Sequence, residues 1–198
     1  ALQMREQHIK RERATSNICT ASALMASMTG FYCVYNGPEG LRRAAETAHL
    51  ATATVARALE AMDYRLASKE FFDTLEVEAE AAVVQLLALE QGINFYYPSE
   101  GRVRMSFDEV TTAAEIETVV SIFAAAKGKK AKAVKAVTES CVPTALRRQS
   151  PYLQEPVFNV YRSESALMRY IKKLELRDIS LANSMISLGS CTMKLNAA

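Results

Sequence analysis

The chain has 198 residues, of which 49% are hydrophobic and 23% charged, and its formal net charge is +2. These proportions are those of an ordinary globular protein with a core of its own, and so weak a net charge does not indicate a polyanionic partner. No apolar run approaches the ~20 residues of a membrane-spanning helix, and the first residues are too polar for a secretory signal peptide.

The cysteines and histidines predict no metal site. The four cysteines are far apart, no CxxC pair occurs, and only two histidines are present. Reduced thiols in a cytosolic or organellar compartment fit this spacing better than a disulfide scaffold does. Cys19 follows a possible helix start, where a thiol is either redox-sensitive or a small buried residue. His49 is interpreted as a residue on a helix face, and Cys33 and Cys141 as structural residues.

Two helices are predicted in the first third of the chain. After a densely charged stretch over residues 4–13, Thr15, Ser16 or Asn17 can cap a helix whose apolar periodicity runs from Ile18 to Tyr35. The sequence of residues 36–40, Asn-Gly-Pro-Glu-Gly, breaks this helix and is read as a helix–helix turn rather than a phosphate cradle. An alanine-rich helix follows over residues 41–62.

A small sheet and two more helices are predicted next. Residues 71–78 alternate as in a half-exposed strand, and residues 81–91 form a helix closed by Gly92. Strands at 93–97 and 102–107 flank a turn at 98–101, and Thr112 and Glu115 fit a capping box that opens a further helix. Helices and strands alternate irregularly along the chain, and two of the strands are joined by a hairpin. This order indicates a local α+β layer, with helices on one face of the sheet.

Residues 127–135 hold five lysines among glycine and alanine, which is typical of a solvated linker. Nucleic-acid binding by these amines is the alternative, although no aromatic residue lies among them. An irregular, proline-containing stretch follows up to Pro156, after which Ser163 is predicted to cap a helix with Leu167 and Leu174 on one face.

The final segment gathers a thiol, two hydroxyls, an amine and a carboxamide behind Gly189: Ser190, Cys191, Thr192, Lys194 and Asn196. Hydroxyls and backbone N–H groups in such a loop can hold a phosphate or a carboxylate, whereas a buried turn without a ligand needs internal partners for each polar group. The chain stops directly behind this segment, so we expect it to be cut through a functional region.

Several ordered motifs resemble the glycine decarboxylase family, the P-protein of the glycine cleavage system. They run along essentially the whole chain, and although each is short, the ordered set is highly specific: residues 5–20, 35–41, 71–75, 106–112, 156–159, 163–164, 168–170 and 188–196.

This resemblance implies an α/β, aspartate-aminotransferase-like (fold type I) pyridoxal-phosphate enzyme built from two related halves. Residues 1–135 would be the end of the first half, chiefly its small C-terminal α+β domain. Residues 127–142 would be a basic linker, and residues 143–198 would open the second, cofactor-bearing half. Because both halves contribute to one chain, the resemblance implies the fused form of the enzyme and an internal fragment of it.

The implied reaction is decarboxylation of glycine with transfer of the aminomethyl group to the lipoyl arm of H-protein. The family's Schiff-base lysine lies beyond this chain, so the resemblance implies that the isolated fragment is inactive and that Lys194 is not that lysine. Residues 190–196 are then candidates for lining the cofactor and substrate pocket. Interface candidates come from the N-terminal motif: Arg5, His8, Thr15, Ser16 and Asn17.

The partners implied are H-protein, the other glycine cleavage proteins and a second copy of the full-length chain, with no nucleic acid or membrane. The compartment would be the mitochondrial matrix in a eukaryote and the cytoplasm in a bacterium. A non-catalytic assembly or regulatory module that binds no cofactor remains the alternative, with the alanine-rich helices as its interaction surface.

Overall fold

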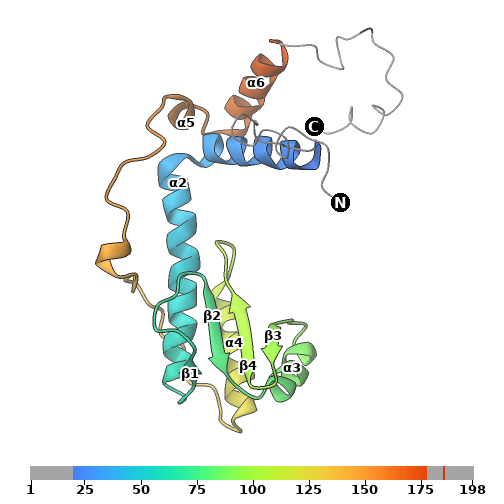
Figure 1. The fold of residues 1–198 in the computed structure, drawn as a ribbon, viewed down its shortest axis with the longest axis vertical. Helices are drawn as coiled ribbons and strands as arrows, with labels where there is room; N and C mark the ends of the chain where they lie inside the picture. Colours follow the sequence, from blue (N-terminus) through green and yellow to red (C-terminus); the bar gives the residue numbers. More distant parts are fainter. Residues whose placement is uncertain (1–19, 178–184, 186–198) are drawn as a thin grey trace, which may run out of the picture. The chain divides into compact units, whose positions relative to one another are not determined.

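The computed structural model describes residues 20–177 and residue 185. These residues fall into two compact units (Figure 1). One unit is continuous and runs from Glu39 to Pro151; the other contains the described residues up to Pro38 and from Tyr152 onward. We call the unit from Glu39 to Pro151 the first unit and the other the second unit. In sequence, the first unit lies between the two parts of the second.

The helix α2 (Thr20–Glu60) contains the predicted break. Gly37 has φ 59° and ψ −174°, which is not helical, so α2 consists of two helical segments. The expected interruption within residues 36–40 is confirmed, but the helix resumes at Pro38 rather than after Gly40. Proline suits this position because the first residue of a helix has no N–H partner to lose.

The unit from Glu39 to Pro151 contains a four-stranded antiparallel sheet of order β1-β2-β4-β3. Its strands are β1 (Arg65–Leu66), β2 (Thr74–Glu78), β3 (Tyr96–Ser99) and β4 (Arg102–Ser106). In β2 and β4 the side chains alternate between core and solvent: Leu75, Val77, Val103 and Met105 are buried. The strand predicted within 71–78 is thus confirmed, and β1 is too short to leave a periodic signal.

The strand predicted at 93–97 is displaced. It begins only at Tyr96, and Pro98 and Ser99, which were expected in the turn, belong to β3. Because β3 lies at the edge of the sheet and its pairing with β4 is irregular between Tyr96 and Ser99, the missing N–H of Pro98 costs no ladder bond.

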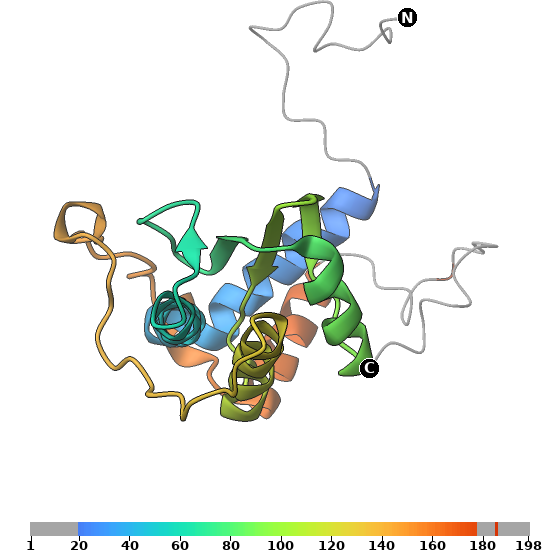
Figure 2. The same cartoon turned by 90° about the horizontal axis from the view of Figure 1, so that it is seen from below.

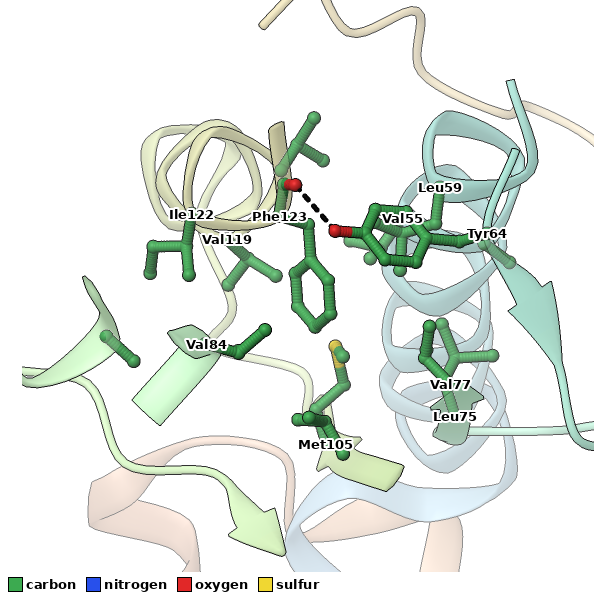
Figure 3. Close-up of a cluster of buried hydrophobic side chains, with 14 of the residues drawn as sticks. Val55, Leu59, Tyr64, Leu75, Val77, Val84, Met105, Val119, Ile122 and Phe123 are labelled. Carbon is green, nitrogen blue, oxygen red and sulfur yellow. Dashed lines mark hydrogen bonds between the residues drawn. The ribbon is translucent and has the colours of Figure 1, made fainter. Parts of the chain in front are cut away.

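Helices cover one face of this sheet, as the sequence predicts (Figure 2). They are the second segment of α2, α3 (Ala81–Glu90) and α4 (Ala113–Ala126). Phe123 of α4 is fully buried, and the hydroxyl of Tyr64 donates to its backbone carbonyl at 2.7 Å (Figure 3). That carbonyl lies in the last turn of α4, where no intrahelical N–H is available to it.

The segment after α4 contains no helix or strand between residues 127 and 143, and a short 3₁₀ turn, η2, follows (Thr144–Leu146). The middle of the segment over residues 127–143 is nevertheless attached to α2. Val137 is buried, and its N–H donates to the hydroxyl of Thr54 at 3.0 Å. Residues 137–142 therefore lie along α2 as a packed strap.

The second unit contains the first segment of α2, a single-turn helix α5 (Val157–Val160) and α6 (Glu164–Glu175). The cap predicted at Ser163 is confirmed, since its hydroxyl accepts from the N–H of Ala166. Tyr170 of α6 meets Phe31 of α2 edge to face, with ring centroids 6.5 Å apart. Among the described residues, no helix is both long enough and apolar enough to cross a membrane.

Candidate functional site

The residues singled out from the sequence as pocket and interface candidates lie outside the described part of the chain. This holds for the C-terminal set (Ser190, Cys191, Thr192, Lys194 and Asn196) and for the N-terminal set (Arg5, His8, Thr15, Ser16 and Asn17). Their roles stay predictions. Within the described ranges, no group of three or more His, Cys, Asp or Glu side chains is placed to hold a metal ion.

Two of the motifs that carry the family resemblance meet in the second unit. Arg162 donates through Nη1 to the backbone carbonyl of Asn36 at 2.9 Å and through Nη2 to Oδ1 of Asn159 at 3.1 Å. The hydroxyl of Tyr152 donates to the carbonyl of Pro38 at 2.6 Å. We call this arrangement the Gly37 clasp: Asn36, Gly37 and Pro38 held by Tyr152 and Arg162.

The clasp requires glycine at position 37. Gly37 is buried, its φ of 59° lies in a region that L side chains rarely adopt, and a Cβ there would collide with the Arg162 guanidinium and the Phe158 carbonyl. Since the carbonyls on both sides of Gly37 accept hydrogen bonds from protein side chains, these residues form a structural turn and not a phosphate cradle, as the sequence predicts.

A second polar cluster is built around His49, which is 1% exposed on α2. Its Nδ1 lies 2.9 Å from the carbonyl of Phe72, and its Nε2 accepts from the backbone N–H of Cys141 at 3.1 Å. A carbonyl can only accept, so Nδ1 carries the hydrogen and Nε2 is the basic nitrogen. The Sγ of Cys141 lies 3.3 Å from the same Nε2.

Arg147 holds the backbone on both sides of Cys141. Its Nε donates to the carbonyl of Val142 and its Nη2 to the carbonyl of Ser140, each at 2.8 Å. The Ser140 hydroxyl accepts from the N–H of Val142 at 3.2 Å. The His49 cluster therefore consists of an oriented imidazole, an exposed thiol and a guanidinium that fixes the loop: His49, Phe72, Ser140, Cys141 and Arg147.

The sequence places His49 on a helix face and treats Cys141 as structural, but it does not bring the two together. The partners of His49 are 23 and 92 residues away in the chain. No local spacing encodes such a contact, because it depends on how residues 137–142 fold back onto α2.

Two lysines of the lysine-rich segment contact the rest of the fold. Lys127 donates through Nζ to the carbonyls of Met62 and Asp63 at 2.8 and 2.7 Å and lies 4.1 Å from the centroid of the Tyr64 ring. Lys129 pairs with Asp63 at 3.4 Å. Two of the amines needed for nucleic-acid binding thus serve the fold, which weakens that alternative.

An open depression of about 390 Å³ lies beside β3, β4 and the start of α4. Its charged residues already have partners. Arg104 at its wall pairs with Glu76, and this ion pair, together with the bond from Arg102, holds the pKa of Glu76 below its ordinary value. Bonds from the N–H and then the hydroxyl of Thr112 lower the pKa of Glu115. This depression therefore presents surface pairs rather than a set of catalytic groups.

The family described as Glycine cleavage system P-protein matches residues 1–123. The chain belongs to the glycine cleavage system P-protein family.

Bacterial relatives align with the whole chain. A protein of Flavobacterium johnsoniae named glycine dehydrogenase (decarboxylating) is 51% identical over 199 residues, covering 100% of this chain and 21% of that protein. Proteins of the same name from Bacteroides fragilis and Vibrio cholerae are 48% and 46% identical, again over 100% of this chain and 21% of each relative. The chain thus spans about one fifth of the length of these relatives.

Two solved structures are similar to parts of the chain. One is a crystal structure of glycine decarboxylase (P-protein) of the glycine cleavage system in inhibitor-bound form, with a TM-score of 0.49 and 27% identity, covering 64% of this chain and 31% of that chain. The other is a NifS-like protein with a TM-score of 0.41 and 17% identity, covering 46% of this chain and 29% of that chain.

Proposed function

We propose that this chain is a segment of a pyridoxal-phosphate-dependent glycine decarboxylase of the glycine cleavage system. The observation that carries the proposal is the alignment of the whole chain, at 51% identity, with a protein named glycine dehydrogenase (decarboxylating). The family match over residues 1–123 supports it independently. The enzyme would decarboxylate glycine, release CO2 and pass the aminomethyl group to the lipoyl arm of H-protein.

The chain's contribution would be part of the pocket wall. The hydroxyls of Ser190 and Thr192, with backbone N–H groups behind Gly189, would supply donors that suit the phosphate of pyridoxal phosphate or the carboxylate of glycine. When bound, the cofactor supplies an aldehyde carbon for the amine and a ring that accepts the electron pair left by CO2. Lys194 would add positive charge near these anions, and the covalent anchor would lie outside this chain.

The Gly37 clasp gives the two proposed halves a specific contact. In this division, residues 1–135 would be the end of the first half and residues 143–198 the start of the second half. Residues 127–142 would form the linker between them. Tyr152 and Arg162 would then belong to the second half and Asn36 to Pro38 to the first. The hydrogen bonds of Tyr152 and Arg162 to the carbonyls on either side of Gly37 would fix how the opening of the second half joins the first-half helix.

The partners and the compartment follow from the same family membership. H-protein and the other glycine cleavage proteins would be the functional partners, and the full-length chain would form a homodimer. The relatives described above are bacterial, which favours the cytoplasm over a mitochondrial matrix.

A chimera tests this proposal. This chain replaces the matching fifth of the Flavobacterium johnsoniae protein, and release of labelled CO2 from carboxyl-labelled glycine is measured with pyridoxal phosphate and lipoylated H-protein. We expect glycine-dependent release within about tenfold of the unmodified protein, because the segment would keep the residues proposed for the pocket wall.

A matched control distinguishes an incorrect functional proposal from a chimera that is inactive because the inserted segment fits badly. The corresponding segment of the Bacteroides fragilis protein, 48% identical to this chain, is placed in the same position. If that chimera is active while the chimera with this chain folds, dimerises and releases no CO2, the catalytic proposal is wrong and the non-catalytic module is favoured.

A further inference from the structure

We propose that a groove at the end of α2 binds an acidic segment of a partner protein, in which carboxylates flank one bulky apolar side chain. The groove has a volume of about 220 Å³, and its lining comes from α2, α4 and the lysine-rich segment. We call it the Arg57 groove, after the arginine in the last turn of α2. All of its lining belongs to the first unit, so the proposal does not depend on the decarboxylase activity.

The floor of the Arg57 groove is apolar. Val120 of α4 is 2% exposed, and Ala58, Met62 and Val134 are partly buried against the same core. A cavity of about 150 Å³ is large enough to bind benzene. The Arg57 groove therefore has room for one aromatic or branched aliphatic side chain.

Three exposed cations surround this floor: Arg57, Lys132 and Lys135. No Asp or Glu is found among the described residues that line the groove. Within residues 20–177, none of the three cations has an ion-pair or hydrogen-bond partner, whereas Lys127 and Lys129 of the same segment both bond to the turn after α2. The positive charge at the groove is thus left for an external anion.

The lysine-rich segment holds its two cations beside the floor. Val134 packs against the core, and Val137 is buried, with its N–H donating to the hydroxyl of Thr54 at 3.0 Å. Lys132 and Lys135 are exposed residues of this attached segment. Cations from two different elements therefore border one apolar floor, without a loop that must first become ordered.

This combination favours a protein segment over other anions. A carboxylate can accept two N–H bonds from the guanidinium of Arg57, while an apolar side chain beside it fills the groove and leaves water. Single-stranded nucleic acid binds where its bases can stack on aromatic rings, and no described residue that lines the groove is aromatic. A contact of this size is typical of a weak, transient partner.

The test titrates the 198-residue chain against the labelled peptide Asp-Glu-Phe-Glu-Asp and measures fluorescence anisotropy. The ionic strength is about 0.01 M, where charges act over about 30 Å. One control peptide has alanine in place of phenylalanine, and the other has the amides Asn and Gln in place of all four acids. We expect each control to bind at least about fivefold more weakly, because one lacks the apolar anchor and the other the charges. No binding of the phenylalanine peptide, or equal binding of the alanine peptide, would overturn the proposal.

Paired variants locate the binding site. Lys132→Gln combined with Lys135→Gln should weaken binding of the phenylalanine peptide about tenfold. Lys69→Gln combined with Lys130→Gln removes the same charge from exposed positions that do not line the groove, and should change binding less than about twofold. Ala61→Leu places a larger side chain at an exposed position of the lining and should abolish the preference for phenylalanine over alanine. Equal losses in the two double variants would overturn the proposal, since they would reflect net charge alone.

Two further titrations exclude other occupants. If a short oligothymidylate displaces the phenylalanine peptide at equal concentration, the groove binds nucleic acid and the proposal is wrong. The peptide is also titrated against the folded Flavobacterium johnsoniae chimera that carries this chain. Retained binding is expected, and its loss would show that the rest of that protein covers the groove. Because peptide binding is the readout, a chimera that releases no CO2 still tests this proposal separately from the decarboxylase activity.

Discussion

The guanidinium of Arg162 donates to the backbone carbonyl of Asn36 at 2.9 Å, across 126 residues of sequence. It occupies the space that a side chain at the next residue, Gly37, would need. The position of Arg162 therefore depends on the absence of a side chain at residue 37, whose positive φ also favours glycine. A change at either residue should loosen the attachment of residues 152–162 to the first segment of α2.

Replacing Gly37 by alanine should destabilise the chain by about 2–3 kcal/mol, because the backbone conformation at this position is one that almost only glycine adopts and the methyl group displaces Arg162. Urea unfolding followed by circular dichroism measures the change. Gly30→Ala is the matched control in the same helix: a Cβ there meets nothing within 4 Å, so a gain of about 0.5–1 kcal/mol is expected. Equal effects at both positions would contradict the role given to the clasp.

The cap of α4 gives a second prediction. Thr112 accepts from the N–H of Glu115 while the Glu115 carboxylate accepts from the N–H of Thr112, which satisfies two orphan donors at once. Thr112→Ala should cost about 1 kcal/mol of unfolding free energy. Thr118→Ala removes a hydroxyl of the same type that bonds only to the carbonyl of Ala114 inside the helix, and should be neutral or slightly stabilising. Thermal unfolding of both variants distinguishes a cap from a general loss of threonine.

Tyr64 gives a prediction that depends on pH. Tyr64→Phe removes the bond to the Phe123 carbonyl and should cost about 1–2 kcal/mol at neutral pH. Burial raises the pKa of Tyr64 above its ordinary value of 10.0, so the folded state holds the proton where the unfolded state releases it.

The stability difference between wild type and Tyr64→Phe should therefore be constant below about pH 10, the ordinary pKa of tyrosine, and shrink as the pH rises further. Urea unfolding at pH 8 and pH 10.5 checks this expectation; a difference that grows in alkali would show that the hydroxyl is not held in its neutral form.

The lysine-rich segment offers a matched pair of substitutions. Lys127→Met removes two hydrogen bonds to the carbonyls after α2 and should cost about 1 kcal/mol. For Lys130, the described residues offer no hydrogen bond or ion pair, so Lys130→Met should leave stability unchanged within about 0.5 kcal/mol. Chemical denaturation compares the two. Equal effects would mean that Lys127 belongs to a solvated linker like its neighbour.

The sequence predicts those features of the fold that depend on near neighbours. The capping box of Thr112 and Glu115, the Ser163 cap and the helix break at Gly37 are each encoded within four residues, and the structure confirms all three. The bounds predicted for β3 are wrong because Pro98 reads locally as a turn residue, whereas the irregular edge of the sheet accommodates it. Two-residue β1 and single-turn α5 are too short for any periodicity.

The sites behave differently because they depend on contacts between distant residues. The contacts of His49 with Cys141 and of Arg162 with Asn36 span 92 and 126 residues, and no motif spacing predicts either. The pocket prediction at Ser190–Asn196 came from chemistry and family resemblance, and it stays a prediction because these residues lie outside the described part of the chain. Family membership, by contrast, was recognisable from ordered motifs and is confirmed by the match over residues 1–123.

The most direct measurement of the central claim locates the covalent anchor of the cofactor. The Flavobacterium johnsoniae chimera that carries this chain is loaded with pyridoxal phosphate, reduced with borohydride and mapped by mass spectrometry. We expect one pyridoxyl-lysine adduct in the part of the protein outside this chain and none at Lys194. A stoichiometric adduct at Lys194, or no adduct in a folded chimera, would contradict the claim that this chain supplies a wall to a pocket anchored elsewhere.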